Sequence, residues 1–343
     1  MEYLPNQWYA AAWSHELTQA LMVRTLLDEP VLMYRTQDGE PVALSDRCPH
    51  RFAPLHSGKR FGDVVQCPYH GLQFDKTGAC VKNPIGNGAI PAKARARVFP
   101  LAERNGIVWM WFGDAGPDPA RIVNFGFLDE PGKYAYAEGY MQLDANYTLV
   151  SDNLLDLSHA EFLHPNLANP GANQRVKFSV EQEGNTVHAF NQRPSEPPTV
   201  LIRNAFSGKP PGDTIDMWSN TTWNPPSSIC VEVGGTRLGG SKEEGVNTLA
   251  AHLITPISKN RSHYFWKMAR TFRRDEAEFG EKFQSMVQSA FFTEDKPIIE
   301  AQQRYMELPD GRQPESVLLQ SDGAAVRARR VMASLMEQNV RGG

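Results

Sequence analysis

Short apolar runs separated by turn residues occupy the chain from about residue 22 to residue 113. The runs at 30–34 and 41–44 flank an Asp38-Gly39 pair, a pattern typical of two antiparallel strands joined by a tight turn. The continuous β-prone run at 107–112 ends at Gly113 and predicts a buried strand that closes this first unit. The first third of the chain is therefore predicted to be an antiparallel β domain.

A different pattern follows the turn-rich segment 113–119, so we expect two domains, 1–118 and 119–343. A helical segment is predicted near 146–164. Strand-like runs that suggest an antiparallel sheet follow at about 176–190, 228–234, 247–255 and 262–270. A long helix is predicted from about 275 to 306, with residues at fourfold spacing on one face: Phe279, Phe283, Val287, Phe291, Asp295, Ile299 and Gln303. Residues 324–340 predict a C-terminal helix.

Charge and hydropathy narrow the possible partners. The 343-residue chain has a formal net charge of −4 and no Lys/Arg run, which argues against nucleic acid as the main partner. Its N-terminal residues lack a basic and apolar leader, and no stretch approaches the ~20 apolar residues of a membrane span. We therefore expect a soluble cytoplasmic protein that acts on a small molecule or another protein.

Two motifs, Cys48-Pro49-His50 and Cys67-Pro68-Tyr69-His70, each pair one cysteine with one histidine. If two irons share two sulfides, one iron can take both thiolates and the other both imidazoles, which is the ligation of a Rieske [2Fe-2S] centre. Structural zinc sites usually take their thiolates from one turn and their imidazoles from another, so the interleaved order favours iron, although zinc remains the alternative. The predicted site is an electron carrier.

The remaining cysteines, Cys80 and Cys230, are interpreted as free thiols packed as small apolar residues. The sequence by itself does not exclude a disulfide between them, but a chain of this length does not need one, and a reducing cytosol would not keep it.

A second set of candidate ligands lies in the segment 153–165. Asn153, Asp156 and His159 are three residues apart and would share one face of a regular helix. His164 lies five residues after His159, about 140° around the axis, but Pro165 disfavours the α conformation at His164. We therefore expect the helix to end or unwind there, which allows both imidazoles to reach one ion.

Asp295 is the candidate third ligand, because it places a carboxylate on the apolar face of the long predicted helix, where an unpaired charge is costly. Pro297 predicts a kink beside it. Two histidines and one carboxylate form the facial triad of non-haem Fe(II) oxygenases. The alternatives are an ion pair of Asp295 with an arginine such as Arg273 or Arg304, and Glu294 as the ligand in its place.

With both sets of residues in view, the chain resembles the oxygenase component of Rieske-type non-haem iron aromatic oxygenases. Its length and the segment 292–303, which begins Phe292-Thr293-Glu294-Asp295-Lys296-Pro297 and continues to Gln303, resemble the vanillate O-demethylase group, which includes aryl-ether demethylases and sulfonate methyl-monooxygenases. The resemblance implies an α+β fold, with an N-terminal Rieske antiparallel β domain followed by a catalytic domain whose antiparallel sheet is flanked by helices.

The resemblance also implies roles for individual residues. Cys48, His50, Cys67 and His70 would hold the [2Fe-2S] cluster, and His159, His164 and Asp295 would hold mononuclear Fe(II). Asn153 matches a position near the iron. Asp156 would connect His70 of one subunit to His159 of its neighbour in a head-to-tail homotrimer.

The implied activity is monooxygenation of an aromatic acid, most simply O-demethylation of a methoxylated aromatic such as vanillate with release of formaldehyde. Hydroxylation of a ring or a methyl group, as in a sulfonate methyl-monooxygenase, would use the same metals. The chain has no G-x-G-x-x-G fingerprint and no plant-type cluster motif, so a separate flavin and iron-sulfur NADH reductase is expected. A Rieske electron carrier without oxygenase activity is a further alternative.

Residues on the strands after 215 are candidates for the substrate pocket: Trp218, Asn220, Cys230, Glu232 and His252. Of these, Asn220, Cys230 and His252 are the predicted substrate-binding residues. His252 is expected to pair with an acidic substrate.

Overall fold

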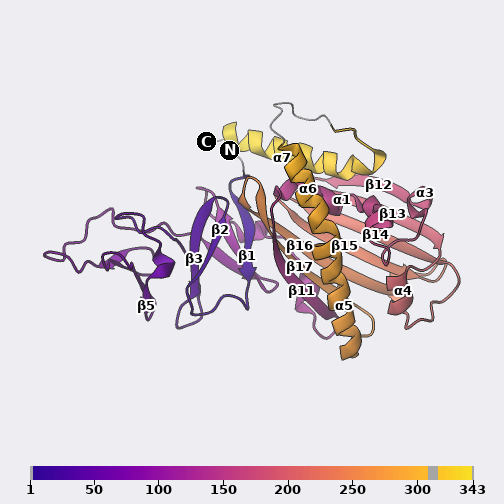
Figure 1. Ribbon diagram of the computed structural model, residues 1–343, viewed down its shortest axis with the longest axis horizontal. Coiled ribbons are helices and arrows are strands. Elements are labelled where there is room, and N and C mark those ends of the chain that lie inside the picture. The colour runs from indigo at the N-terminus through magenta and orange to yellow at the C-terminus, as the bar shows by residue number, and fades with distance from the viewer. Residues whose placement is uncertain (1–2, 308–315, 342–343) are drawn as a thin grey trace. The chain divides into compact units, whose positions relative to one another are not determined.

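The strands and helices of the computed structural model, which describes residues 3–307 and 316–341, divide into two units (Figure 1). The N-terminal unit comprises Pro5–Asn124 together with Thr255–Ser258. The C-terminal unit comprises Met1–Leu4, Phe125–Ile254 and Lys259–Gly343. The boundary expected at residue 118 remains a prediction, and the short segment Thr255–Ser258 was not anticipated as part of the first unit.

The described part of the N-terminal unit contains three antiparallel sheets, as expected from its short apolar runs. The first has the order β1–β10–β9, the second β2–β3–β4, and the third β5–β6–β7–β8. Their strands are β1 Gln7–Trp13, β2 Met22–Leu26, β3 Glu29–Arg35, β4 Pro41–Ser45, β5 Lys59–Phe61, β6 Val64–Gln66, β7 Gln73–Phe74, β8 Cys80–Lys82, β9 Leu101–Arg104 and β10 Ile107–Phe112. The hairpin predicted around Asp38-Gly39 is β3 and β4, and Gly39 takes the left-handed conformation with φ of 86°.

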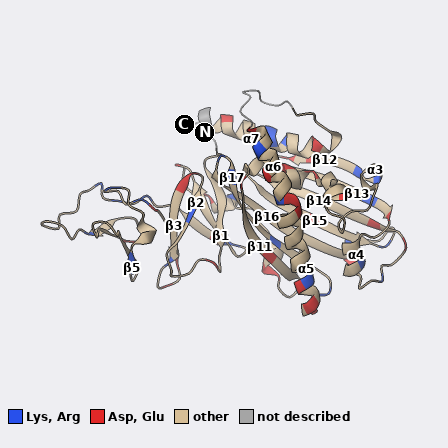
Figure 2. Cartoon of the chain, in the orientation of Figure 1, with Lys and Arg blue, Asp and Glu red and all other residues tan. Residues whose placement is uncertain are grey.

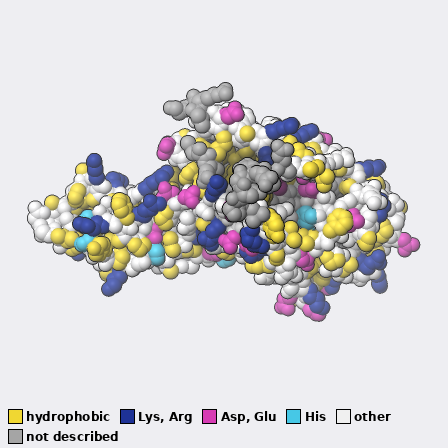
Figure 3. Space-filling view, turned by 45° about the horizontal axis from the view of Figure 1, so that its top comes forward, with side chains coloured by type: hydrophobic (Ala, Val, Ile, Leu, Met, Phe, Trp, Pro, Cys, Tyr) yellow, Lys and Arg dark blue, Asp and Glu magenta, His cyan; other side chains and the backbone are white. Residues whose placement is uncertain are grey.

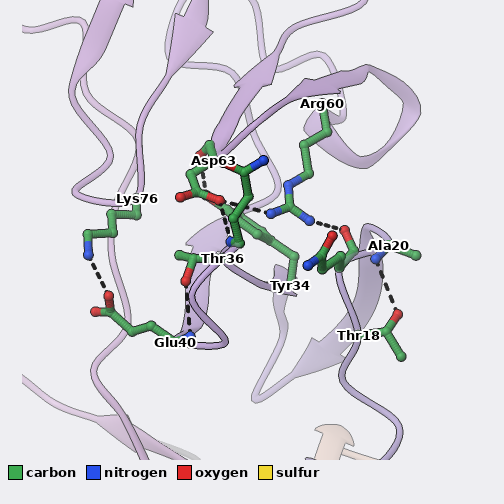
Figure 4. A network of polar contacts seen from close by, with 10 residues as sticks. Thr18, Ala20, Tyr34, Thr36, Glu40, Arg60, Asp63 and Lys76 are labelled. Atoms are coloured by element: carbon green, nitrogen blue, oxygen red, sulfur yellow. Dashed lines mark hydrogen bonds and ion pairs between the residues drawn. The ribbon is translucent and has the colours of Figure 1, made fainter.

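A polar network joins the strands of the N-terminal unit (Figure 4). The Tyr34 hydroxyl donates to the Asp63 carbonyl oxygen at 3.0 Å, and the Arg60 guanidinium donates to the Asp63 carboxylate at 3.0 Å. Arg60 also lies over the Tyr34 ring, 4.8 Å from its centroid. Burial raises the pKa of Tyr34 to about 12, so the phenol remains a hydrogen-bond donor throughout the physiological pH range.

The C-terminal unit is built on one seven-stranded antiparallel sheet with the order β11–β17–β16–β15–β14–β13–β12. Its strands are β11 Ala135–Leu143, β12 Lys177–Glu183, β13 Thr186–Glu196, β14 Ile215–Asn224, β15 Ser228–Thr236, β16 Val246–Ser258 and β17 Arg261–Arg270. The predicted strand at 176–190 is a hairpin, β12 and β13, which turns at Gly184. Strand β11 was not predicted. The sheet and its helices confirm the expected α+β class.

Helices pack on this sheet, and the candidate iron ligands lie in the segments that adjoin them. They are α1 Tyr147–Leu155, α2 Ala160–Leu163, α3 Ala172–Arg175, α4 Val200–Ala205, α5 Ala277–Ser289, α6 Lys296–Met306 and α7 Gly323–Arg341. Helix α5 packs against β11, α1 against β14 and β15, and α7 against β12 and β13. In Figure 1, α5 and α6 follow one another across the sheet. Apolar side chains of α5, among them Phe279, Phe283 and Val287, join the core of this unit.

The structure interrupts both long helices predicted from the sequence. The first breaks at Asp156, which has extended backbone angles and whose carboxylate accepts from the Ser158 N–H at 2.9 Å. The expectation that Asn153, Asp156 and His159 share one regular helix face is therefore wrong, because the Asp156 side chain ends α1 and begins a new turn. The second break is a π-helical segment, Ala290–Asp295, which lies where Pro297 predicted a kink.

Basic and acidic residues are intermixed along the helices of the C-terminal unit (Figure 2). This distribution agrees with the small net charge of −4. Of the helices within residues 3–307 and 316–341, none combines the length and the apolar character needed to cross a membrane.

Candidate metal centres and the adjoining cavity

The two Cys/His motifs lie in loops of the same construction. In each, the cysteine N–H donates to the carbonyl five residues later, and the cysteine carbonyl accepts from the N–H four residues later. The bonds are Cys48 N–H to Ala53 O (2.9 Å), Phe52 N–H to Cys48 O (2.8 Å), Cys67 N–H to Leu72 O (2.8 Å) and Gly71 N–H to Cys67 O (3.1 Å). The loops therefore present their cysteines in equivalent ways.

The fourth residue after each cysteine has a positive φ, 58° at Phe52 and 75° at Gly71. A Cβ added at Gly71 would lie 3.0 Å from Cγ of Pro84, so the second loop has little space for any other residue. Phe52 accepts the same conformation at a cost of about 1–2 kcal/mol. The shape of both loops is thus maintained against local preference.

The four candidate cluster ligands converge. Cys48 and Cys67 are both 1 % exposed. Burial raises the pKa of the Cys48 thiol to about 11, and the neighbouring Cys67 thiol adds to this rise. The rings of His50 and His70 meet edge to face with centroids 4.6 Å apart. His50 is exposed and His70 half-buried, and histidine atoms are visible at the surface of the N-terminal unit in Figure 3. The two buried thiols and the two more exposed imidazoles are the donors that would hold a [2Fe-2S] cluster.

The second group of donors joins residues that are far apart in the sequence. His159, His164 and Asp295 bring one ligand atom each to within 4.8 Å of one another. Oδ1 of Asp295 lies 3.5 Å from Nε2 of His159 and 3.2 Å from Nε2 of His164. Both His164 and Asp295 are 5 % exposed. Two imidazole nitrogens and one carboxylate oxygen fit a facial triad that would hold divalent iron.

Each histidine of this triad uses its other ring nitrogen in a hydrogen bond. Nδ1 of His159 donates to the carbonyl oxygen of Asp156 at 2.7 Å, and Nδ1 of His164 donates to a Glu294 carboxylate oxygen at 2.6 Å. These bonds orient the rings and leave each Nε2 facing Asp295. The arrangement argues against Glu294 as the metal ligand, because its carboxylate is engaged on the far side of His164.

Electrostatics at His164 reflect the same contacts. Burial lowers the pKa of His164, but the Asp295 and Glu294 carboxylates outweigh this effect and hold its pKa above the ordinary value. Asn153 donates through Nδ2 to Oδ1 of Asp295 at 3.2 Å and so limits the rotation of the carboxylate. Neither Arg273 nor Arg304 pairs with Asp295. Arg273 instead pairs with Glu276.

Similarity to known proteins agrees with both sites. Residues 7–93 match the Rieske [2Fe-2S] domain, and residues 143–338 match the vanillate O-demethylase oxygenase C-terminal domain. The chain is 37% identical over 334 residues to the oxygenase component of chloroacetanilide N-alkylformylase from Rhizorhabdus wittichii, covering 97% of this chain and 95% of that protein. It is 37% identical over 336 residues to the oxygenase component of dicamba O-demethylase from Stenotrophomonas maltophilia, covering 98% of both.

A solved structure, dicamba monooxygenase bound to 3,6-dichlorosalicylic acid, superposes with a TM-score of 0.93 at 36% identity, covering 98% of this chain and 99% of the other. This chain belongs to the Rieske oxygenase components of the vanillate O-demethylase group. The fold and the two kinds of iron centre expected from the sequence are those of this family.

In this Rieske oxygenase component, the triad lies at the wall of a cavity of about 460 Å3 within the C-terminal unit. Asn153, His159, His164 and Asp295 contribute to the lining. Most of the remaining wall is apolar and comes from α1, β14, β15, β17, α5 and the π-helical segment, including Leu154, Met217, Val231, Val233, Met268, Phe283 and Phe291. The volume lies in the range of small-molecule pockets, and the apolar wall favours a largely apolar ligand.

Of the three predicted substrate-binding residues, only His252 lines the cavity. It is 2 % exposed, and its Nδ1 lies 2.7 Å from the Tyr264 hydroxyl. Burial lowers the pKa of His252 to about 3, so its imidazole is neutral at physiological pH. His252 therefore offers a hydrogen bond to a substrate, but the expected ionic pairing with an acid does not follow.

Asn220 and Cys230 lie outside the cavity lining. Asn220 pairs across the sheet with Glu232 and donates to its carboxylate at 3.2 Å, on the face opposite that of Ser219 and Val231. Burial raises the pKa of the Cys230 thiol to about 12, so it stays protonated. Asn220 and Cys230 thus belong to strands that line the cavity, β14 and β15, but their side chains lie on the opposite face of the sheet.

Sequence reasoning missed Arg193 on β13, which lines the cavity and is 8 % exposed. Alternation supplied a signal, because Val187, Ala189, Asn191 and Arg193 share one face of the strand and the first two are core residues.

Proposed function

We propose that this chain is a terminal oxygenase that monooxygenates a small aromatic acid, most simply by O-demethylation of a methoxylated aromatic acid such as vanillate. The observation that carries the proposal is the His159, His164 and Asp295 triad at the wall of an apolar cavity, in a chain that also has a Rieske domain. The name of dicamba O-demethylase, a relative that covers nearly the whole chain, supports demethylation.

The protein's own part in this chemistry is to hold and orient. Nε2 of both histidines and Oδ1 of Asp295 would bind the mononuclear iron, while Glu294, Asn153 and the Asp156 carbonyl maintain their directions. When bound, the cluster supplies electrons one at a time and the iron supplies reductive activation of O2. The apolar wall excludes water and positions the methyl C–H bond.

The proposed overall reaction consumes O2, two electrons and two protons. One oxygen atom enters the methyl C–H bond and the other leaves as water. The hydroxylated methyl ether is a hemiacetal, which breaks its C–O bond to give a phenol and formaldehyde. The electrons would come from NADH through a separate flavin and iron-sulfur reductase.

We also propose that Asp156 links subunits in a head-to-tail homotrimer, carrying electrons from His70 of one chain toward His159 of the next. Oδ1 of Asp156 accepts from the Ser158 N–H, and among the described residues Oδ2 has no hydrogen-bond partner. The Asp156 carbonyl already contacts the His159 ring. An Asp156→Asn variant should transfer electrons from cluster to iron slowly with both metals bound, and fast transfer in that variant would remove this role.

The first experiment is iron and acid-labile sulfide analysis of anaerobic protein, followed by O2 and methoxylated aromatic acids with a reductase. The expected result is about three irons and two sulfides per chain with substrate-dependent formaldehyde release. A His159→Ala variant should keep a reducible cluster and lose turnover. If wild type and His159→Ala consume O2 identically and release no formaldehyde, the chain is an electron carrier rather than an oxygenase.

Hydroxylation of a ring or methyl group is the second candidate, because the cavity wall and the triad serve either reaction. Product analysis distinguishes the two. Formaldehyde with a free phenol indicates demethylation, whereas a stable alcohol or a new ring hydroxyl indicates hydroxylation.

A further inference from the structure

The lining of the cavity includes a buried cationic side chain, that of Arg193. Arg193 is the only Lys or Arg among the described residues that line it. Its Nη1 donates to the Ser219 Oγ at 3.0 Å, but within residues 3–307 and 316–341 its Nε has no hydrogen-bond partner and no carboxylate lies within ion-pair distance. Burial lowers the pKa of Arg193. A guanidinium this deeply buried with one neutral acceptor is expensive to maintain, so a compensating group is expected.

The nearest carboxylate in the sequence is already occupied. Both oxygens of Glu196 accept from Arg175, each at 2.7 Å, and one also accepts from Asn169. Glu196 therefore attracts Arg193 only at a distance. Arg175 thus neutralises Glu196, and in the part of the chain that the structure describes the charge of Arg193 has no carboxylate in direct contact.

Another buried arginine, Arg270, shows how the protein provides hydrogen-bond acceptors for a buried guanidinium. Arg270 is 3 % exposed and donates to the carbonyl oxygens of Phe272 and Arg273. Its guanidinium also lies over the Phe279 ring, 5.1 Å from the centroid. Arg193 has no comparable set of acceptors among the described residues, although it is buried almost as deeply.

Ser219 completes the polar end of the cavity. It is 6 % exposed, lines the cavity beside Arg193, and its Oγ accepts from Arg193, which leaves the hydroxyl hydrogen able to donate. The carboxylates in the lining, Glu294 and Asp295, are both engaged with histidines. The donors at Arg193 and Ser219 thus face a space where an anionic oxygen fits.

We propose that Arg193, assisted by Ser219, binds the anionic group of the substrate, a carboxylate or a sulfonate on the aromatic ring. This inference rests on the proposed oxygenase function and assigns its substrate class and the residue that recognises it. His252 is neutral and lies on β16, three strand intervals from β13 or roughly 14 Å across the sheet. The charge of the acid is therefore met by Arg193.

The test is calorimetric binding to the holo-oxygenase under argon, without reductase, so that turnover does not contribute. The probes are 3-methoxybenzoate with 3-methoxybenzamide, and 4-toluenesulfonate with 4-toluenesulfonamide. For one or both of the acids, wild type should bind the anion about 10-fold or more tightly than it binds the corresponding neutral amide. The preferred acid then distinguishes carboxylate from sulfonate.

In Arg193→Gln, binding of the preferred acid should weaken by about 10- to 100-fold, while binding of the amide changes little. Arg193→Lys should keep part of the preference because it keeps the charge. Arg237→Gln is the matched control, since it removes the same charge from an exposed pair with Glu244 and should bind like wild type.

Equal binding of acid and amide by wild type, no binding of any anion, or wild-type affinity in Arg193→Gln would each overturn the inference. The wild-type comparison stands even if Arg193→Gln does not fold. Formaldehyde release with Arg193-independent acid binding would remove this inference and leave the proposed function. Arg193-dependent acid binding without O2-coupled turnover would remove the proposed function and leave Arg193 as an anion site.

Discussion

Glu294 accepts a hydrogen bond from Nδ1 of His164 at 2.6 Å, and its replacement gives a direct test of how the iron site is maintained. Hydrogen-bond partners of this kind typically change metal affinity by 10- to 100-fold. Glu294→Gln keeps an oxygen acceptor and loses the charge, so we expect about 10-fold weaker iron binding. Glu294→Ala loses both the acceptor and the charge, so we expect about 100-fold weaker iron binding. In free energy, the expected losses are ~1.4 kcal/mol for Glu294→Gln and ~2.7 kcal/mol for Glu294→Ala.

The assay is anaerobic competition for Fe(II) between the protein and a chelator, with iron and acid-labile sulfide counted per chain. The sulfide content should not change, because the cluster ligands lie in other loops. Glu278→Gln is the matched control, since Glu278 is an exposed residue of α5 that pairs with Lys282. Wild-type affinity in Glu294→Ala would refute the reasoning. Iron loss in Glu294→Gln as complete as in Asp295→Asn would make Glu294 a ligand.

Two further predictions concern stability. Gly71→Ala should destabilise the N-terminal unit by about 1–2 kcal/mol, because φ at residue 71 is positive and Pro84 Cγ would lie 3.0 Å from the new Cβ. Urea unfolding and the cluster content of the protein measure this effect. Unchanged values of both would contradict the prediction. Hydrogen bonds from Arg175 hold the pKa of Glu196 below its ordinary value, so the stabilisation is present above pH ~4.5 and is lost as the pH falls through the lowered pKa. Glu196→Gln should therefore be about 1.5–3 kcal/mol less stable than wild type at pH 7. The gap should narrow in acid, and a pH-independent gap would contradict the pairing.

Local chemistry was sufficient to select residues that the structure brings together at both candidate metal centres. Pairs such as Cys48 and His50 are close in the sequence, and the structure brings the two loops together. Asp295 was selected because an unpaired carboxylate on an apolar helix face is energetically costly and therefore suggests a bound cation or ion pair. The structure places this carboxylate beside both histidines. The break at Asp156 was not predicted, because a side chain that bonds to a nearby N–H competes with the helix only when the tertiary structure favours it.

The pocket residues were harder to predict, because each strand alternates faces and the sequence does not say which face is covered. One known inward residue on each strand would have decided between Asn220 and Ser219, or between Cys230 and Val231. Arg193 was overlooked for a related reason. A charged residue at the end of a half-buried strand looks solvent-exposed until the neighbouring strand and helix are in place.

Strand β16 contains residues of both units, since Thr255–Ser258 belong to the N-terminal one. The Leu27 N–H donates to the Pro256 carbonyl oxygen at 2.8 Å, and the Thr255 hydroxyl donates to the Ala10 carbonyl oxygen at 2.7 Å. Modular engineering must respect this division. A chimera that takes the N-terminal unit from a relative must exchange residues 5–124 and 255–258 together, so the two units cannot be recombined at a single crossover.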